Sequence, residues 1–391
     1  MKIVYVVNEA SFFISHRLWL AREAQERGAN VVLICGENTG EHRLEDYGIE
    51  YLTLPMSRSG ANPLIELGTF FKLLKLYKQL LPDLVHHVTI KPVLYGTVAA
   101  RLAGVRGVVN AIPGMGFVFT RRGVRAHVRR WFVFQLYRLA VTHPNMRVIF
   151  QNREDRAAFL SRSIVDPAQV VLIRGSGVDL QEFEATPEPP TDDIVFVLIA
   201  RMLRDKGVGE FVAAANRLRP SYPHWNFWLV GDVDPGNPSS LSVEDLMTWD
   251  NEGVIHWLGH REDIAEVLKL AHVVVLPSYY REGLPKTLLE AAASQRSMIA
   301  SRVAGCLEVV TDGVTGLIVE PRDVEDLTAT MARLGNDAKL RERLARAALS
   351  KAEAVFRVQD VVRDTFVVYQ QLLRRPLSRA EQAEKVREQR R

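Results

Sequence analysis

The chain has 391 residues, of which 47% are hydrophobic and 25% are charged, the balance of a soluble globular protein rather than of a disordered or collagen-like one. Its length predicts two to three domains, each able to bury its own core. The formal net charge of +4 identifies no partner by itself. The two cysteines, Cys35 and Cys306, are too few for a disulfide framework and lack zinc-site spacing, so they favour a reducing cytoplasm.

No segment is expected to span a membrane. The longest run without a charged residue is residues 107–120, which is 14 residues, and a spanning helix needs about 20. The opening MKIVYVV reaches Asn8 and Glu9 after only five apolar residues. That is too short for a secretory signal, and it predicts a first strand instead.

Short, almost continuously apolar runs alternate with amphipathic segments along the chain. Such runs are typical of parallel strands buried on both faces. The expected strands are residues 3–7, 31–35, 84–87, 107–111, 148–151, 194–200, 226–230, 254–258, 273–277 and 297–301. The alternation predicts an α/β fold with doubly wound sheets. In TIM barrels strands and helices alternate in the same way. A break in the middle of the alternation therefore distinguishes two doubly wound domains from one barrel.

The break is TPEPPT, residues 186–191, where proline and polar residues replace the periodic pattern. Because proline continues neither a helix nor a central strand, this segment is the expected interdomain linker. It predicts two Rossmann-like domains, residues 1–187 and 192–356, that face each other across a cleft, with ligands at the carboxyl ends of the strands. A helix over 357–375 should follow, and the charged segment 376–391 is expected to be mobile.

The sequence PSYYREGLPKTLLEAAA, residues 277–293, contains a strand end, a short loop and a helix start. A proline stands at the natural first helical position, so the backbone amides of Gly283 and Leu284 predict an anion site reinforced by the helix dipole. Glu282 precedes the helix and Glu290 lies more than one turn inside it. One carboxylate is therefore expected to contact a sugar beside the phosphates, and the other a ribose further along. The alternatives are two solvated glutamates on a surface helix, or the acid and nucleophile of a glycosidase.

A second motif, LIARMLRDKG at residues 198–207, follows the first strand of the second half. Arg201 and Lys206 are therefore expected at the carboxyl end of that strand, pointing into the cleft. There their charges would neutralise a leaving diphosphate without a metal. The alternative is a solvated basic loop that opens a helix.

The two motifs together carry a resemblance. EGLPKTLLE has the form E-x7-E, and with RMLRDKG upstream it resembles the retaining nucleotide-sugar glycosyltransferases of family 4, which have the GT-B fold. The likeness extends over nearly the whole chain and is greatest for the subgroup that builds O-antigens, capsules and lipid-linked oligosaccharides. The segments that carry it are FFISHRLWLA (12–21), HHVTIKP (86–92), IPGMGFVF (112–119), QNREDRAAF (151–159) and GSGVDLQEF (175–183).

The resemblance implies how the reaction would run. Arg201 and Lys206 would hold the donor diphosphate with the amides of Gly283 and Leu284. No protein nucleophile, metal or cofactor is implied, because the leaving phosphate would take the acceptor proton on the same face of the sugar. The anomeric configuration would be retained.

The resemblance also implies which residues and which domain bind the donor and the acceptor. Glu282 would hydrogen-bond hydroxyl groups of the donor sugar, Glu290 would bind the ribose, and Arg261 would lie near the base. Residues 1–187 would bind the acceptor and residues 192–356 the nucleotide-sugar. The helix over 357–375 would pack back on the first domain.

The first half departs from the family pattern in two places. Residues 8–11 read NEAS where many members have a glycine-rich loop, and residues 112–116 read IPGMG where many have a histidine. The backbone amides of Gly114 and Gly116 are expected to replace the lost contact.

Three other residues of the first half are assigned to the acceptor side of the cleft. His16 and Arg17, near a helix start, are expected to touch the acceptor phosphate or the donor, with a surface position as the alternative. His86 and His87 end a strand, and His87 is assigned to the cleft. A buried, hydrogen-bonded histidine is the alternative there.

A D-x-D motif and a cysteine could indicate a metal site and a reactive thiol, and neither is predicted here. Asp232 and Asp234 have the D-x-D form that binds a metal in another glycosyltransferase fold, but a strand-end loop explains them. No metal site is therefore expected. Cys306 follows a strand end, and because nothing near it would activate a thiol it is expected to pack in the core.

Positive charge is concentrated in residues 101–150, which hold nine arginines and no acidic residue, whereas the rest of the chain has 41 basic and 46 acidic residues. Arginines and aromatics interleave in RRGVRAHVRRWFVFQLYR, residues 121–138, so a helix there would suit a lipid interface. The expected membrane patch is Arg121, Arg122, Arg125, Arg129, Arg130 and Trp131. The alternatives are a helix packed into the first domain, or nucleic acid, for which no motif is present.

The sequence therefore predicts a glycosyltransferase that moves a sugar from a nucleotide donor, expected to be UDP-linked, to a polyprenyl-diphosphate-linked saccharide at the cytoplasmic face of a membrane. Neither a cofactor nor nucleic acid is expected as a partner. The alternatives are a GT-B enzyme with a soluble acceptor, a nucleotide-sugar epimerase, and a non-catalytic membrane-binding scaffold. An epimerase would convert the donor without any acceptor, and a scaffold has no need of both motifs together.

Overall fold

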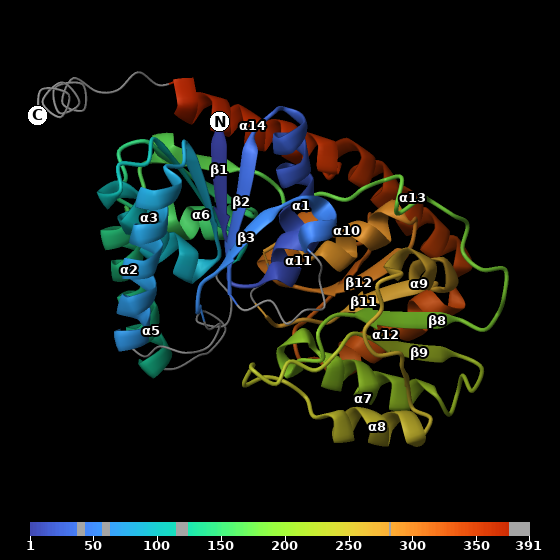
Figure 1. Ribbon diagram of the computed structural model, residues 1–391. Helices are drawn as coiled ribbons and strands as arrows, with labels where there is room; N and C mark the ends of the chain where they lie inside the picture. The colour runs from blue at the N-terminus through green and yellow to red at the C-terminus, as the bar shows by residue number, and fades with distance from the viewer. Residues whose placement is uncertain (37–43, 57–62, 115–123, 281–282, 375–391) are drawn as a thin grey trace, which may run out of the picture.

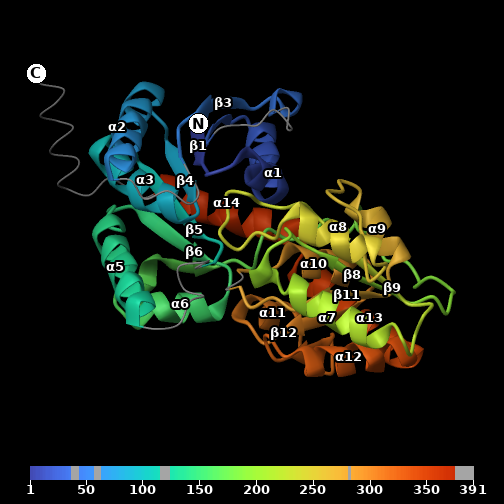
Figure 2. The same ribbon diagram turned by 90° about the horizontal axis from the view of Figure 1, so that it is seen from below.

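The computed structural model describes residues 1–36, 44–56, 63–114, 124–280 and 283–374. They form two α/β domains, each built on one parallel sheet (Figures 1 and 2). The first sheet has seven strands in the order β3-β2-β1-β4-β5-β6-β7, and the second has six in the order β10-β9-β8-β11-β12-β13. The predicted α/β class with two Rossmann-like domains is confirmed.

The first sheet and its helices occupy the first half of the chain. The strands are β1 (Lys2–Val6), β2 (Asn30–Cys35), β3 (Glu50–Thr53), β4 (Leu84–Val88), β5 (Gly107–Ile112), β6 (Met146–Phe150) and β7 (Val170–Leu172). The helices are α1 (Ala10–Glu26), α2 (Pro63–Leu80), α3 (Ile90–Leu102), α5 (Val124–Ala140) and α6 (Arg153–Leu160), with the 3-10 turns η1 (Leu44–Tyr47) and η2 (Pro167–Gln169).

The second sheet and its helices follow. The strands are β8 (Val195–Ile199), β9 (Asn226–Val230), β10 (His256–Trp257), β11 (Val273–Leu276), β12 (Ser297–Ser301) and β13 (Leu317–Val319). The helices are α7 (Val208–Leu218), α8 (Val243–Asn251), α9 (Ile264–Leu270), α10 (Lys286–Ala293), α11 (Ala304–Val309), α12 (Val324–Asn336), α13 (Ala338–Val355) and α14 (Val358–Arg374), with the 3-10 turn η3 (Arg204–Lys206).

The strands are continuously apolar because both faces of each sheet are covered. In β1, Val4 and Val6 belong to the core on one face, whereas Ile3 and Tyr5 belong to the core on the other. All four side chains are fully buried. Since burial of each large aliphatic side chain contributes about 1.5–3 kcal/mol, a polar residue on either face would be costly.

The last helix, α14, crosses from the second domain to the first (red in Figure 1). It packs against α1, β5 and β6, with Phe366, Tyr369 and Leu372 buried in the core of the first domain. The Tyr369 hydroxyl lies 2.5 Å from Nδ1 of His86 and 3.2 Å from the hydroxyl of Tyr5. The α14 helix therefore joins the two domains through a buried face with polar contacts inside it.

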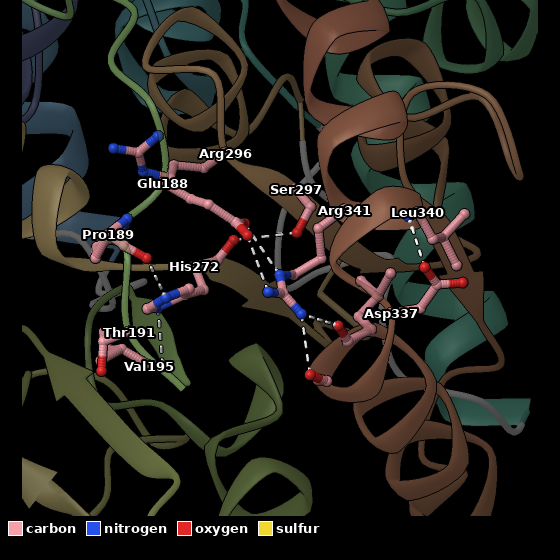
Figure 3. A network of polar contacts seen from close by, with 12 residues as sticks. Glu188, Pro189, Thr191, Val195, His272, Arg296, Ser297, Asp337, Leu340 and Arg341 are labelled. Carbon is pink, nitrogen blue, oxygen red and sulfur yellow. Dashed lines mark hydrogen bonds and ion pairs between the residues drawn. The ribbon is translucent and has the colours of Figure 1, made fainter. Parts of the chain in front are cut away.

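The segment 186–191 runs along the second domain and is bonded to it (Figure 3). The Arg341 guanidinium makes two hydrogen bonds to the Glu188 carboxylate, at 2.9 and 3.0 Å. The fully buried Arg296 and Nε2 of His272 donate to backbone carbonyls of the segment. These contacts fix the path of the chain between the two sheets.

Candidate active site

The turn before α10 faces the first domain. The Leu284 N–H donates a hydrogen bond to Oε1 of Gln151, 3.2 Å away, and Leu284 is 7% exposed. A Cβ built on Gly283 would stand 1.2 Å from the carbonyl oxygen of Pro113. The turn that we expect to bind an anion is therefore in direct contact with Gln151 and Pro113 of the first domain. Glu282 lies outside the described residues.

Backbone hydrogen bonds hold the two motif loops together. The Asp205 carbonyl accepts from the N–H groups of Tyr279 and Tyr280, both at 3.0 Å. Gly207 has φ +78°, and a Cβ there would stand 2.2 Å from the carbonyl oxygen of Pro277. Only glycine fits both the backbone and the space. The loop after β8 and the loop after β11 consequently form one unit at the carboxyl edge of the second sheet.

The two predicted cations lie on this unit. Arg201 forms an ion pair with Asp234, with Nη1 and Oδ2 2.5 Å apart, and its side chain is 40% exposed. The ammonium of Lys206 lies 5.4 Å from the ring centroid of Tyr280, a cation–π distance. Arg201 is therefore paired with a carboxylate, and Lys206 lies beside an aromatic ring. Sequence reasoning missed Asp234 as the partner of Arg201.

Glu290 lies on α10 with its carboxylate buried. It is 5% exposed and pairs with Lys286, one turn earlier on the same helix, at 2.9 Å. Sequence reasoning missed Lys286, although the i,i+4 spacing of lysine and glutamate was a signal for this pair. The carboxylate that is predicted to bind a ribose is thus held in place by a neighbouring cation.

A small pocket lies between the domains beside Lys286. It is lined by Ser15, His16 and Trp19 of α1 and by Glu182 and Lys286 of the second half of the chain, among others. His16 therefore lies at the domain interface, as the sequence places it.

The surroundings of His16 are cationic. Its ring stacks on Phe12 with centroids 4.2 Å apart. Burial and then the positive charges of Arg17, Lys286 and Lys206 lower the pKa of His16 below its ordinary value. The neutral imidazole is consequently the form present near neutral pH, chiefly because the ring is buried.

Two assignments from the sequence need correction. Arg17 is 3% exposed, and its nearest charged or polar neighbours include Tyr5 and Tyr369 in the core. His87 is fully buried between the hydroxyl of Tyr77 and Oδ1 of Asn110, both 2.8 Å away. Neither side chain lines the domain interface, because each lies on the face of its element that packs into the core of the first domain.

The remaining predicted residues divide between described and undescribed parts of the chain. Gly114 is half-buried and follows Pro113, which touches Gly283, whereas Gly116 lies outside the described residues. Both arms of the Arg261 guanidinium are bonded to Asp263, at 2.5 and 2.7 Å. Arg261 is thus occupied by a carboxylate of its own loop.

The predicted membrane residues lie on or just before α5. Trp131 is 63% exposed on this helix; Arg125, Arg129 and Arg130 lie on the same helix. Arg121 and Arg122 fall outside the described residues. Within the part of the chain that the structure describes, no helix is long and apolar enough to cross a membrane.

The described residues include no group of three or more His, Cys, Asp or Glu side chains placed to hold a metal ion. Asp234 of the D-x-D motif instead pairs with Arg201. Arg201 and Lys206 are the side-chain cations on the loop after β8.

Comparison with known families gives two matches that follow one another along the chain. Residues 2–152 match the glycosyl transferase 4-like family, and residues 179–351 match the glycosyl transferases group 1.

Two curated relatives extend over most of the chain. An N,N'-diacetylbacillosaminyl-diphospho-undecaprenol alpha-1,3-N-acetylgalactosaminyltransferase of Campylobacter jejuni is 29% identical, with 90% of this chain and 94% of the relative covered. A UDP-Gal:alpha-D-GlcNAc-diphosphoundecaprenol alpha-1,3-galactosyltransferase of Escherichia coli is 27% identical, with 80% and 81% covered.

Solved structures share the fold. Anabaena HepE in complex with UDP and glucose superposes with a TM-score of 0.76 at 18% identity, covering 95% of this chain and 99% of that one. A glycosyltransferase from Rickettsia africae gives 0.74 at 17% identity, covering 96% and 99%. With the two family matches, these likenesses confirm the resemblance drawn from the motifs: the chain belongs to the family 4 glycosyltransferases and has their GT-B fold.

Proposed function

We propose that this glycosyltransferase moves a sugar from a UDP-sugar to a saccharide carried on a polyprenyl diphosphate, with retention of the anomeric configuration. The single observation that carries the proposal is the joined unit of Arg201, Lys206 and the Gly283–Leu284 turn at the edge of the second sheet. Two relatives that match most of the chain are named for undecaprenol-diphosphate-linked acceptors. Transfer from a UDP-sugar to a synthetic polyprenyl-diphosphate saccharide tests it directly, and equal transfer to the free saccharide would favour a soluble acceptor.

The proposed chemistry follows from the charges at the site. The bond between the anomeric carbon and the donor phosphate breaks while the acceptor oxygen bonds to that carbon. The acceptor proton passes to the leaving phosphate. Arg201, Lys206 and the helix dipole of α10 stabilise the negative charge that develops on the leaving diphosphate, and Glu282 is assigned to the donor sugar.

Replacing Glu290 by alanine should weaken UDP binding by about 10- to 100-fold, because a hydrogen bond to a charged group contributes about 1.5–3 kcal/mol. Calorimetric titration with UDP, GDP and ADP measures it. The variant Lys286→Met is the matched control, since it breaks the Lys286–Glu290 ion pair and leaves the carboxylate. A larger loss in Glu290→Ala than in Lys286→Met would assign the contact to the carboxylate itself, and unchanged affinity in Glu290→Ala would remove its ribose role.

The transfer is expected to need no metal, because cations and amides surround the proposed diphosphate site. Excess EDTA should leave the initial rate of transfer unchanged. Complete inhibition that is reversed by adding a divalent cation would instead assign Asp232 and Asp234 to a metal.

The proposed site of membrane contact is the helix layer of α2, α3 and α5, on the side of the first domain away from the second (Figure 2). These helices hold nine lysines and arginines and one acidic residue. Phe71, Trp131 and Phe132 are each more than half exposed on the same layer. Exposed aromatics beside an excess of cations suit an anionic lipid surface.

Neutralising Lys72, Lys75 and Arg130 to glutamine together should weaken binding to vesicles that contain phosphatidylglycerol by about 10- to 100-fold, since each cation contributes about 1 kcal/mol near such a surface. Vesicle sedimentation measures it. Replacing three cations of α13, Lys339, Arg343 and Arg346, by glutamine is the matched control. Equal weakening by both sets would place the lipid contact elsewhere.

A further inference from the structure

One side chain of the first domain contacts the turn that we assign to the donor diphosphate. Gln151 directly follows β6 and is 3% exposed. Its Oε1 accepts the hydrogen bond from the Leu284 N–H at 3.2 Å and lies 2.7 Å from the position that a Cβ on Gly283 would take. Gln151 therefore meets both residues of the turn.

The second polar atom of this carboxamide is Nε2. Nε2 of Gln151 is buried and has no hydrogen-bond partner among the described residues. A buried donor left unpaired costs about 1–3 kcal/mol, and such a group in a native structure requires an explanation. Because Nε2 carries two donors and the turn leads into the N-terminal end of α10, an anionic oxygen is the partner that fits both.

Asn152, the next residue, limits how Gln151 can move. Asn152 is 1% exposed, and its Oδ1 accepts from the Asp155 N–H at 2.7 Å, which caps α6. Its Nδ2 lies 3.5 Å from the carbonyl oxygen of Gly283. The backbone at Gln151 is thus fixed to a helix start and to the turn, which leaves rotation of the side chain as its remaining freedom.

We propose that Gln151 is a donor-binding residue supplied by the first domain, whose Nε2 amide donates a hydrogen bond to the diphosphate of the nucleotide-sugar. The proposal rests on the proposed function. The diphosphate replaces Oε1 as the acceptor of the Leu284 N–H. Rotation of the carboxamide by a half-turn then lets Nε2 donate to the same diphosphate. Because Gln151 belongs to the first domain and the turn to the second, this contact links donor binding to the meeting of the two domains.

The test uses Gln151→Glu and Gln151→Leu in the full chain. A purely structural role of Oε1 predicts that the glutamate, which still accepts from the Leu284 N–H, binds nucleotide normally. Our assignment predicts that both variants bind UDP at least about tenfold more weakly, as expected for losing a hydrogen bond to a charged group. The glutamate should be the weaker of the two because it also repels the diphosphate. The loss should appear for UDP and not for uridine, and the donor KM should rise more than the acceptor KM.

Gln25→Glu is the matched control, because it makes the same change of charge on α1, where Gln25 bonds to the carbonyl of Gly48 at the surface. Melting temperatures are measured first, and the neutral leucine variant carries the comparison if the glutamate destabilises the domain interface. Unchanged UDP affinity in the folded variants, beside a wild-type protein that binds UDP and transfers sugar, overturns the role of Gln151 alone. A wild-type protein that binds no nucleoside diphosphate overturns the proposed function itself.

Discussion

Replacing Arg201 and Lys206 together by alanine should lower the transfer rate by at least about 10² to 10³, the typical loss when one preorganised donor to a developing oxyanion is removed. The two cations lie on one loop unit beside the α10 helix start. Their removal leaves the leaving diphosphate with backbone amides alone. The effects of substituting residues that act as a unit are not additive. Each single variant should therefore lose nearly as much of the transfer rate as the double variant. Initial rates at saturating donor and acceptor measure it.

The control is Arg204→Ala, which removes an exposed cation from η3, the 3-10 turn that also contains Lys206. It should leave the rate near that of the wild type. Circular dichroism and melting temperature establish that the double variant is folded, since Arg201→Ala also removes the ion pair to Asp234. A double variant with wild-type activity would overturn the assignment of these cations to the leaving group.

Replacing Gly283 by alanine should reduce transfer by about 5- to 150-fold. An added methyl group would stand 1.2 Å from the Pro113 carbonyl oxygen of the first domain, so the two domains must separate to admit it. Overpacking of this kind costs typically 1–3 kcal/mol, which sets the expected loss in the population of the closed arrangement. The turnover number and the affinity for UDP should both fall, because the methyl group acts on the contact between the domains that also involves Gln151.

Gly209→Ala in α7 is the matched control, since a Cβ there would meet no heavy atom within 4 Å. It should be neutral or stabilise the protein by up to about 1 kcal/mol, the usual gain of alanine over glycine in a helix. Small-angle X-ray scattering of Gly283→Ala should show a larger radius of gyration than the wild type. Wild-type kinetics in Gly283→Ala would mean that the Pro113–Gly283 contact is absent from the active arrangement.

The sequence alone determined the fold class and the two motif loops, because both depend on local patterns. Runs such as residues 3–7 are apolar throughout because both faces of a parallel strand are buried. Such a run can be recognised without knowing which strands and helices pack against it. The same reasoning missed β3 and β7, whose residues are half-buried or exposed at or near sheet edges. It also missed β13 (Leu317–Val319). The apolar runs VVL of β7 and LIV of β13 are only three residues long, too short to be distinguished by periodicity, and EYLT of β3 has no apolar run.

The tertiary structure decided which side chain meets which. His87 and Arg17 have polar types that suit an active site, yet the faces of β4 and α1 on which they lie turn them into the core. The contact of Gln151 with Leu284 joins residues 133 positions apart in the chain. No sequence period encodes such a pairing, because it depends on how two separately folded domains are placed against each other.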